Sequence, residues 1–303
     1  MRLAFVLFNW FPHGGLQPDL VKVVRACQGR ADIEIHCLDW QGERLAGVVT
    51  HVVDFRRPSK AGQRAAFADY VVQQVKPAVD LVIGFNRLPG LDYYFAADVC
   101  FAARAYARPW WYRLAPRTRQ YLRFESAVFG EDSKTIALLL SRLQREQYEQ
   151  FYRTPSSRLI DLPPGIDRRH RAGADAPALR AQFRRQHGIA DDALVVLQIG
   201  SSYTTKGVDR SLAALAALPR ELHGRVHYCL LGRDNRLAAW QQRARATGLG
   251  ERLHFLPAGS DVPGCMQGAD ILLHPSLYES AGLVILEALV AGLPVLTTAT
   301  CGY

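Results

Sequence analysis

The chain of 303 residues is 49% hydrophobic and 21% charged, which excludes an intrinsically disordered protein and exceeds the length of one typical domain. Its formal net charge of +9 favours acidic partners such as phosphates, nucleic acid or an anionic membrane face. The six cysteines are scattered without metal-ligand spacing, which is typical of reduced core thiols in a cytosolic protein. No stretch approaches the roughly twenty apolar residues of a membrane span.

The first half of the chain alternates short apolar runs with amphipathic patterns. Residues 3–8 predict a buried strand rather than a secretion signal, because Asn9, Pro12 and His13 follow without a small-residue cleavage site. β-Branched apolar runs predict further strands, and a three-to-four spacing of apolar residues predicts helices. The expected strands are 3–8, 33–40, 49–55 and 80–86, and the expected helices are 19–30 and 64–76.

The same pattern restarts after residues 153–178, which are rich in Pro, Gly, Arg and Ala. The strands expected there are 193–200, 225–232, 252–257, 270–276 and 294–298, and the helices 208–218, 235–248 and 282–292. Near-continuous apolar strands that alternate with helices are typical of parallel sheets covered on both faces. We therefore predict an α/β fold of two Rossmann-like, doubly wound domains, 1–160 and 179–303, joined by a linker at 161–178. Ligands are expected at the carboxyl ends of the strands, in a cleft between the domains.

The segment FPHGGLQPD, residues 11–19, follows the first predicted strand. Gly14 and Gly15 allow the backbone to turn tightly and approach a ligand, and the next helix directs its free N–H groups to the same place. The spacing is not G-x-G-x-x-G, so an ordinary strand-to-helix turn explains the pair equally well.

The segment IGSSYTTKGVDRS, residues 199–211, follows the first strand of the second half. Lys206 and Gly207 enter a helix there, where a lysine can neutralise a phosphate. The segment lacks G-x-x-x-x-G-K-[ST], which disfavours a P-loop nucleotidase. A solvated surface lysine is the alternative.

Two glutamates stand eight positions apart in YESAGLVILEA, residues 278–288. Ser280 is the expected N-cap of a helix and Gly292 its C′ residue, so that Glu279 precedes the helix and Glu287 lies two turns into it. Their backbones are then roughly 12 Å apart, which argues against a glycosidase pair at about 5 to 9.5 Å. Between the two acids lie the free helix-start amides of Ala281, Gly282 and Leu283, which are suited to a phosphate. Two carboxylates that bind hydroxyls on either side of a phosphate site are the arrangement expected for a sugar nucleotide. The alternative is a helix-start charge and a solvent-facing residue.

Together these segments resemble the family-4 retaining glycosyltransferases of GT-B fold. The shared features are the early Gly-Gly, LPPGID at 162–167, Lys-Gly at 206–207 and the spacing of the glutamates. Longer segments are similar to the group within this family that adds the first hexose to the inner-core heptose of lipopolysaccharide. These segments are FPHGGLQPD, VIGFNRLPGLDYYFAADVC, KGVDRSLAALAALP and AGLPVLTTATCGY, and the resemblance spans residues 1–303.

The resemblance implies a role for each matching residue of the first half. Gly14 and Gly15 would approach the leaving phosphate and transferred sugar of the donor. Gln17 and Asp19 would border the reaction centre on the acceptor side, and Asp98 would lie near the reacting hydroxyl.

In the second half, the resemblance implies the contacts of the donor. Lys206 would pair with its diphosphate, Glu279 would hold hydroxyls of the hexose, and Glu287 would hold the ribose. An arginine after PPGI also belongs to the pattern; Arg168 and Arg169 compete for that place, and we favour Arg169.

One departure from the family lies beside Lys206. The family usually has Arg-Lys before the glycine where this chain has Thr205-Lys206, so one phosphate-neutralising charge at the donor site is missing or supplied elsewhere. No D-x-D motif occurs, so no metal or other cofactor is demanded, and Lys206 with helix-end amides would stabilise the departing diphosphate.

The resemblance implies transfer of a hexose, glucose in first place, from a UDP-sugar to inner-core heptose with retention of configuration. The expected route is a same-face return in which the leaving phosphate accepts the proton of the acceptor, although Asp98 could also be argued as a nucleophile. The alternatives are transfer of galactose or N-acetylgalactosamine, and a GT-B-like sugar-nucleotide epimerase.

From Val99 to Phe124 the chain has no acidic residue but many arginines and aromatic residues. Such a strip suits docking on an anionic leaflet, although an RNA-binding strip or a solvated helix packed on the core would look similar. Because the implied acceptor is a glycolipid, we predict a cytoplasmic protein, peripheral on the inner face of the inner membrane, with no nucleic-acid partner. The predicted membrane contacts are Arg104, Arg108, Trp110, Trp111, Arg113, Arg117, Arg119 and Arg123.

The sequence ends just after the last predicted strand. The family continues for some tens of residues, including a helix that crosses back onto the first domain, so we expect the second domain to be incomplete here. Both glutamates are present, so donor binding is expected to survive, whereas domain closure and turnover would suffer.

Overall fold

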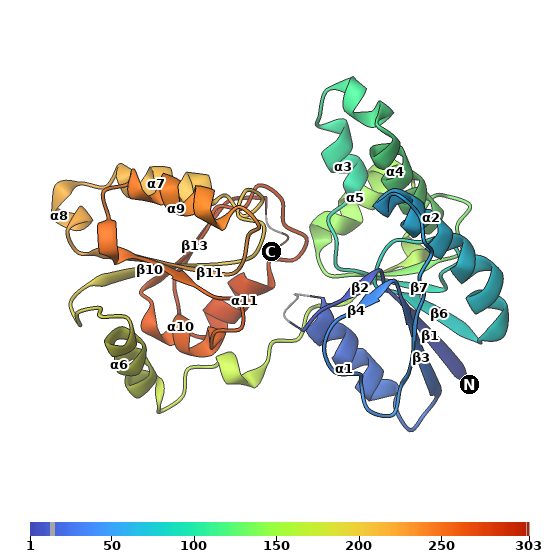
Figure 1. Ribbon diagram of the computed structural model, residues 1–303, viewed down its shortest axis with the longest axis horizontal. Helices are drawn as coiled ribbons and strands as arrows, with labels where there is room; N and C mark the ends of the chain where they lie inside the picture. The colour runs from blue at the N-terminus through green and yellow to red at the C-terminus, as the bar shows by residue number, and fades with distance from the viewer. Residues whose placement is uncertain (13–15, 301, 303) are drawn as a thin grey trace. The chain divides into compact units, whose positions relative to one another are not determined.

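The computed structural model describes residues 1–12, 16–300 and 302 (Figure 1). The chain divides into two compact units; unit 1 comprises Met1–Pro163 with Gly302, and unit 2 begins at Pro164. Each unit is built on a parallel sheet with helices, which confirms the predicted α/β class.

Unit 1 contains a seven-stranded sheet in the order β5-β3-β1-β6-β7-β8-β9, and every neighbouring pair is parallel. Its strands are β1 (Arg2–Val6), β3 (Asp32–Cys37), β5 (Val49–Val52), β6 (Leu81–Gly84), β7 (Tyr93–Ala96), β8 (Ile136–Leu139) and β9 (Leu159–Asp161). Two short strands, β2 (Asn9–Trp10) and β4 (Asp39–Trp40), form a separate pair. The order of the sheet reverses between β1 and β6, which is where doubly wound folds bind ligands.

Helices α2 (Lys60–Tyr70), α4 (Pro116–Phe129) and α5 (Arg142–Tyr152) supply large side chains of the unit 1 core, including Phe67, Phe129 and Tyr148. Ser141 starts α5 with a capping box, in which its hydroxyl accepts from the Gln144 amide while the Gln144 side chain reaches back to the backbone. The helical segments are α1 (Gln17–Cys27), α2 (Lys60–Tyr70), η1 (Val71–Val75), η2 (Lys76–Ala78), α3 (Phe101–Tyr106), η3 (Trp110–Leu114), α4 (Pro116–Phe129), α5 (Arg142–Tyr152) and η4 (Ser156–Arg158).

Unit 2 contains a five-stranded parallel sheet in the order β12-β11-β10-β13-β14. Its strands are β10 (Leu194–Ile199), β11 (Val226–Leu231), β12 (Leu253–Leu256), β13 (Ile271–His274) and β14 (Val295–Thr297). The helical segments are η5 (Arg168–His170), α6 (Ala176–Gln186), α7 (Val208–Ala216), α8 (Arg220–His223), α9 (Leu237–Arg245), η6 (Gly250–Arg252), α10 (Val262–Gly268) and α11 (Leu283–Val290).

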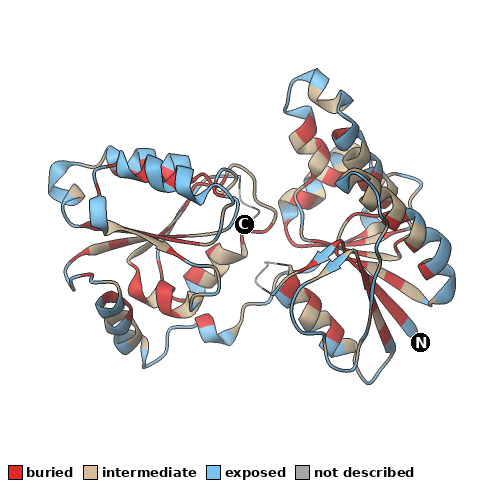
Figure 2. Cartoon of the chain, in the orientation of Figure 1, coloured by how far each residue is buried: buried red, intermediate tan, exposed pale blue. Residues whose placement is uncertain are grey.

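Alternation along β10 builds two cores on the two faces of the unit 2 sheet. Val195 and Leu197 join one cluster with Phe183 of α6, and Leu194 and Val196 pack against the other cluster, which includes Trp240 of α9. In Figure 1, α7 and α9 cover one face and α6, α10 and α11 the other. Figure 2 shows that buried residues follow the strands and the inner sides of these helices.

Part of the expected linker is regular structure, because η5 and the start of α6 fall within residues 161–178 and pack on unit 2. The five cysteines within the described residues are free thiols. Among the described helices, none combines the length and apolar character needed to cross a membrane.

Candidate active site

The order of the unit 2 sheet reverses between β10 and β13. In open α/β sheets, ligands bind beyond the carboxyl ends of the strands at such a point. Two loops leave the sheet there: residues 200–207 connect β10 to α7, and residues 275–282 connect β13 to α11. The candidate donor site is formed by these two loops.

Glu279 is the centre of a largely buried charge cluster in the second loop. One carboxylate oxygen, Oε2, accepts a hydrogen bond from His274 Nε2 at 2.8 Å and pairs with the ammonium group of Lys206. The side chains of Glu279 and Lys206 are 10% and 21% exposed, and that of His274 is fully buried. Burial alone would raise the pKa of Glu279, but the hydrogen bond from His274 and the charge of Lys206 lower the pKa to about 2. Glu279 is therefore an ionised acceptor suited to sugar hydroxyls.

Close backbone packing fixes the two loops against each other. Gly207 has a φ of +69°, and a Cβ there would lie 2.0 Å from the carbonyl oxygen of Pro275. The Leu277 amide donates to the Thr205 carbonyl at 2.8 Å, and the Ser276 hydroxyl donates to the same oxygen at 3.1 Å. A glycine is therefore required beside Lys206, as in the Lys-Gly pair that the sequence shows.

A buried polar network behind Lys206 was not predicted from the sequence. Gln198 of β10 is fully buried and donates from Nε2 to the Lys206 carbonyl at 2.7 Å. Its other amide atom, Oε1, accepts from Ser211 at 2.6 Å and from Tyr228 at 2.5 Å. In the sequence, the only sign of this network is a glutamine within the otherwise apolar strand β10. His274 is likewise a polar residue within an otherwise apolar strand, β13.

Helix α11 begins at Leu283 rather than at Gly282, and the expected N-cap Ser280 is wrong. Gly282 holds that position with a φ of +70°, so the backbone turns into the helix through a conformation that serine would adopt only with strain. The C′ residue is Gly292, with a φ of +74°, as predicted. The Ile285 amide donates to the Gly282 carbonyl at 2.8 Å. The Leu283 and Val284 amides precede it at the helix start, where amides have no partner within the helix and an anion is favoured.

Glu287 lies within α11, and its side chain is 20% exposed. Its Oε1 is 3.6 Å from Nε2 of His170, a buried residue of η5. The neighbouring Arg169 is largely exposed, and its guanidinium forms two hydrogen bonds to the Asp167 carboxylate, at 2.9 and 3.0 Å. The segment that follows PPGI therefore contacts Glu287 through His170, a residue that was not predicted from the sequence.

Unit 1 has a cavity of about 680 Å³ at the carboxyl ends of β1 and β6. Asp98 supplies the one carboxylate among the described residues that line it, whereas several arginines do so, namely Arg64, Arg87, Arg104 and Arg117. Gln17 also lines the cavity; it is 4% exposed, and its Oε1 has no hydrogen-bond partner within the described chain. The cavity is cationic and offers polar atoms to a ligand.

Contacts with Arg87 and Gln144 hold Asp98 at this cavity. Arg87 Nη2 lies 3.5 Å from Asp98 Oδ2, and Gln144 Nε2 donates to the Asp98 carbonyl at 3.0 Å. Arg87 is itself anchored by Glu125, which is fully buried and also accepts from the Phe101 amide at 2.7 Å. Neither Arg87 nor Glu125 was predicted; a charged pair 38 positions apart gives no local sequence signal.

Of the remaining predicted residues, Asp19 lies on α1 outside the cavity lining, and its carboxylate is 3.3 Å from the Lys22 ammonium. Gly14 and Gly15 lie outside the described residues. The structure thus brings Lys206 and Glu279 together in unit 2 and places Gln17 and Asp98 at one cavity in unit 1.

The arginine–aromatic strip forms α3, η3 and the first part of α4. Four apolar or aromatic side chains around η3 are strongly exposed: Tyr106 at 54%, Trp110 at 67%, Trp111 at 61% and Leu114 at 49%. The Arg113 guanidinium stacks 4.4 Å from the Tyr106 ring centre. Exposed tryptophans beside arginines are typical of an interfacial surface.

Comparisons with known proteins show which enzyme family the chain is similar to. The family model "Glycosyl transferases group 1" matches residues 180–303. The chain is 38% identical over its whole length to the lipopolysaccharide glucosyltransferase WaaG of Escherichia coli K12, of which it covers 82%. It is 30% identical, over 62% of its length and 46% of the relative, to a D-inositol 3-phosphate glycosyltransferase of Actinosynnema mirum.

Solved structures agree. The crystal structure of WaaG superposes with a TM-score of 0.93 at 36% identity, over 99% of this chain and 82% of that one. The UDP-glucose complex of HepE from Anabaena superposes with a TM-score of 0.73 at 20% identity, over 100% of this chain and 81% of that one, which shows a shared fold.

Proposed function

Because the chain belongs to the glycosyltransferase family that includes the lipopolysaccharide glucosyltransferase WaaG, we propose that it transfers glucose from UDP-glucose to inner-core heptose of lipopolysaccharide with retention of configuration. The observation that carries the proposal is the Lys206–Glu279–His274 cluster at the reversal point of the unit 2 sheet. It unites a cation for phosphate with an ionised acceptor for hydroxyls, directly before a helix start.

The proposed donor lies along this helix start. Glu279 accepts hydrogen bonds from hydroxyls of the hexose, and Glu287, further along α11, accepts from the ribose. The first amides of α11 and the Lys206 ammonium bind the diphosphate between them. Because Lys206 is already paired with Glu279, the donor phosphates would compete for its charge and release Glu279 toward the sugar.

The proposed chemistry needs no metal, because the groups that bind the diphosphate also stabilise the charge on it as the glycosidic bond breaks. The leaving phosphate oxygen accepts the proton of the attacking hydroxyl on the same face of the sugar, which retains its configuration. Asp98 is proposed to orient that hydroxyl, since Arg87 and the Gln144 amide hold it at the cavity of unit 1.

The cationic cavity of unit 1 is the proposed acceptor site. Arg64 and Arg117 line it with one carboxylate, which favours a sugar that carries phosphate or carboxylate groups. We further propose that the exposed strip around η3 docks on an anionic leaflet, which would place the protein on the inner face of the inner membrane where a glycolipid acceptor is presented.

The test is a transfer assay with purified lipopolysaccharide acceptors that end at the inner core, with and without phosphate on the heptose. We expect glucose transfer from UDP-glucose in the presence of a chelator, faster than from UDP-galactose or UDP-N-acetylgalactosamine, and faster to the phosphorylated acceptor. Consumption of the UDP-sugar without any acceptor would instead favour an epimerase. Turnover that requires a divalent metal would contradict the proposed metal-free route.

A further inference from the structure

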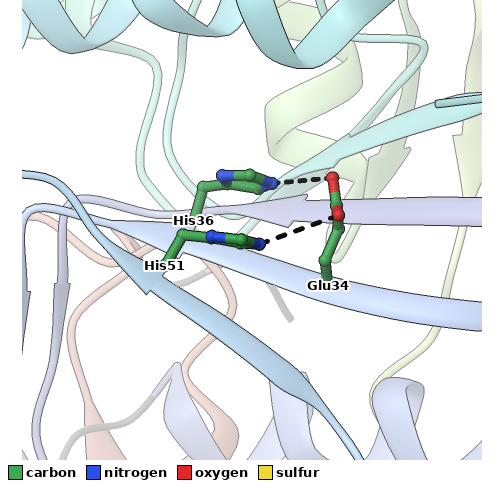
Figure 3. Close-up of side chains that lie close together, drawn as sticks. All are labelled: Glu34, His36 and His51. Atoms are coloured by element: carbon green, nitrogen blue, oxygen red, sulfur yellow. Dashed lines mark hydrogen bonds and ion pairs between the residues drawn. The ribbon is translucent and has the colours of Figure 1, made fainter. Parts of the chain in front are cut away.

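Three side chains that can ligate a metal gather at one edge of the unit 1 sheet, away from the cavity lining (Figure 3). Glu34 and His36 lie two residues apart on β3, so they point to the same face of the sheet. His51 of β5 is the cross-strand neighbour of His36 in the parallel register. The edge of this sheet therefore presents two imidazoles and a carboxylate side by side.

The geometry of the three groups converges. His36 Nε2 lies 2.9 Å from Oε1 of Glu34, and His51 Nε2 lies 3.8 Å from Oε2 of the same carboxylate. The two imidazole rings stack with centroids 4.6 Å apart and 11° between their planes, and one ligand atom from each residue lies within 4.8 Å of the other two. A tetrahedral zinc ion with bonds of about 2.0–2.1 Å spaces its ligand atoms about 3.4 Å apart. The two observed distances bracket that value. Because a metal lies near the plane of each imidazole that it binds, the two stacked rings would have to rotate out of their near-parallel arrangement to close the site.

A neighbouring hydroxyl can support His36 from outside the site. The Tyr70 hydroxyl of α2 is 2.9 Å from His36 Nδ1. A metal-ligating histidine usually donates its second ring N–H to an oxygen, and the Tyr70 oxygen can accept that proton when Nε2 binds a metal. The contact would also fix the orientation of the ring.

Exposure of the three side chains gives the ion a path. The His36 side chain is only 5% exposed, but those of Glu34 and His51 are 27% and 43% exposed. An ion can enter from the His51 side, and a water molecule can take the fourth position of a three-ligand site.

A simpler reading is that Glu34 only satisfies the buried His36. That reading accounts for the 2.9 Å contact but not for the second imidazole, which Figure 3 shows directed at the other oxygen of the same carboxylate. We propose that Glu34, His36 and His51 form a binding site for a divalent transition metal, with Zn²⁺ the ion that suits two imidazoles and one carboxylate. The ion would tie the short edge strand β5 to β3 and, through Tyr70, to α2.

A second group of histidines in unit 2 provides a matched control. His227 Nδ1 and His254 Nε2 are 3.0 Å apart and bond to each other, and His187 stacks edge-on against His254. The positive charges of Arg184 and Arg252 act on His227, which disfavours a cation there. We therefore expect no zinc to be bound by this group.

The experiment uses the full chain with any affinity tag removed. The protein is stripped with a chelator, incubated with Zn²⁺, freed of unbound metal, and measured for zinc per chain by mass spectrometry and for Tm. The wild-type chain should retain one Zn²⁺ and show a higher Tm with zinc than without. His51→Ala and Glu34→Gln should each retain none and lose the zinc-dependent rise in Tm, whereas His254→Gln should behave as the wild type.

His51 is half-exposed, so the metal-free Tm of His51→Ala should match that of the wild type, which separates loss of metal from loss of fold. Glu34→Gln keeps a hydrogen-bond acceptor for His36 and serves as the second variant. The proposal is overturned if the wild-type chain retains no zinc, or if His51→Ala or Glu34→Gln still retains one equivalent. None of these measurements depends on glycosyl transfer, so the outcome is independent of the proposed function.

Discussion

His274 Nε2 lies 2.8 Å from the same carboxylate oxygen of Glu279 that pairs with Lys206. His274 ends β13 and Lys206 follows β10, so two neighbouring strands deliver their groups to one oxygen atom. The arrangement keeps Glu279 ionised despite its burial, because the hydrogen bond and the positive charge outweigh desolvation and lower its pKa to about 2. An ionised carboxylate that is largely buried from water is suited to holding hydroxyls in one orientation.

The first prediction follows from that cluster. Glu279→Ala and Lys206→Ala should each lower kcat/KM for glycosyl transfer at least about tenfold, or roughly 1.4 kcal/mol of transition-state stabilisation. Steady-state kinetics with UDP-glucose and a lipopolysaccharide acceptor measures the effect. Glu146→Ala is the control, because Glu146 pairs with Arg142 on an exposed face of α5 and such pairs contribute little. Wild-type kcat/KM in either site variant would remove the basis of the functional assignment.

A second prediction concerns the buried network of Gln198, which bonds to the backbone of Lys206. Gln198→Met should keep the volume of the side chain but leave the Ser211 and Tyr228 hydroxyls and the Lys206 carbonyl without their buried partner. We expect a loss of about 1–3 kcal/mol in stability, together with a higher KM for UDP-glucose, because the loop that carries Lys206 is less well positioned. Denaturant unfolding and donor titration check the two effects. Ser211→Ala removes one partner only and should show a smaller change in both; an unchanged KM in Gln198→Met would mean that the network does not position Lys206.

The sequence predicted the fold class from apolar runs that alternate with helical spacing, and most strands near the site fell where expected. It did not predict β7, β8 and β9, although the predicted strands β5, β6 and β14 are equally short. Only the first residue of the edge strand β9 is buried, so this strand carries no apolar alternation.

The candidate site was predictable to the extent that its residues lie in glycine-marked loops. Lys206 and Glu279 stand beside such loops, and the structure joins them in one ion pair. Gln198 and Glu125 could not be found in the same way, because their partners are backbone atoms or distant in sequence. His274 is only five positions from its partner Glu279, but it lies within an apolar strand rather than in a glycine-marked loop. The N-cap at Ser280 was mispredicted because side-chain preference was weighed without the left-handed turn that Gly282 allows.

A third prediction addresses the arginine that Thr205 replaces in the family pattern. The Arg236 guanidinium donates to the Thr204 hydroxyl at 2.6 Å, which places a positive charge beside the loop of Lys206. We expect Arg236→Ala to raise the Kd for UDP about three- to tenfold, the size of one partly exposed charge-assisted contact, and Thr205→Arg to lower it. Isothermal titration with UDP measures both.

Arg243→Ala is the matched control for Arg236→Ala. Both guanidinium groups lie over the Trp240 ring, at 5.1 Å for Arg243 and 6.0 Å for Arg236, so both variants lose a similar stacking contact. Equal Kd values for UDP in the two variants would show that Arg236 acts through packing rather than through charge at the donor site.

A fourth prediction concerns the pH dependence of stability. Burial, with the nearby His227 and His187, lowers the pKa of His254 from its ordinary 6.5 to about 4. The unfolded chain therefore binds a proton at His254 below about pH 6.5, whereas the folded chain does so only near pH 4, so stability is full above pH 6.5 and is lost as the pH falls toward 4. Burial also lowers the pKa values of His187 and His227, with Arg252 and Arg184 adding to the effect on His227.

Denaturant unfolding at pH 7.5 and pH 5 measures this dependence. Each unit of pKa difference corresponds to about 1.4 kcal/mol, and because the ring is partly accessible we expect His254 to contribute about 1 kcal/mol of the loss. His254→Gln should therefore lose less stability than the wild type between the two pH values. An equal loss in both proteins would assign the acid sensitivity to other groups.

The last prediction tests the exposed strip on η3. Trp110 and Trp111 are more than 60% exposed, so replacing both with alanine removes apolar surface that contributes little to the core. On vesicles that contain anionic lipid, we expect the double variant Trp110→Ala/Trp111→Ala to bind at least about tenfold more weakly than the wild type, since a buried aromatic side chain contributes on the order of 1–3 kcal/mol at an interface. Transfer to a short acceptor, assayed without detergent, should stay unchanged, because neither tryptophan lines the cavity.

Leu222→Ala is the control for the double variant. Leu222 is an exposed apolar residue of unit 2 outside the strip, so its replacement should leave vesicle binding intact. Co-sedimentation that is the same for neutral and anionic vesicles, or for the wild type and the double variant, would contradict the membrane-docking role of this surface.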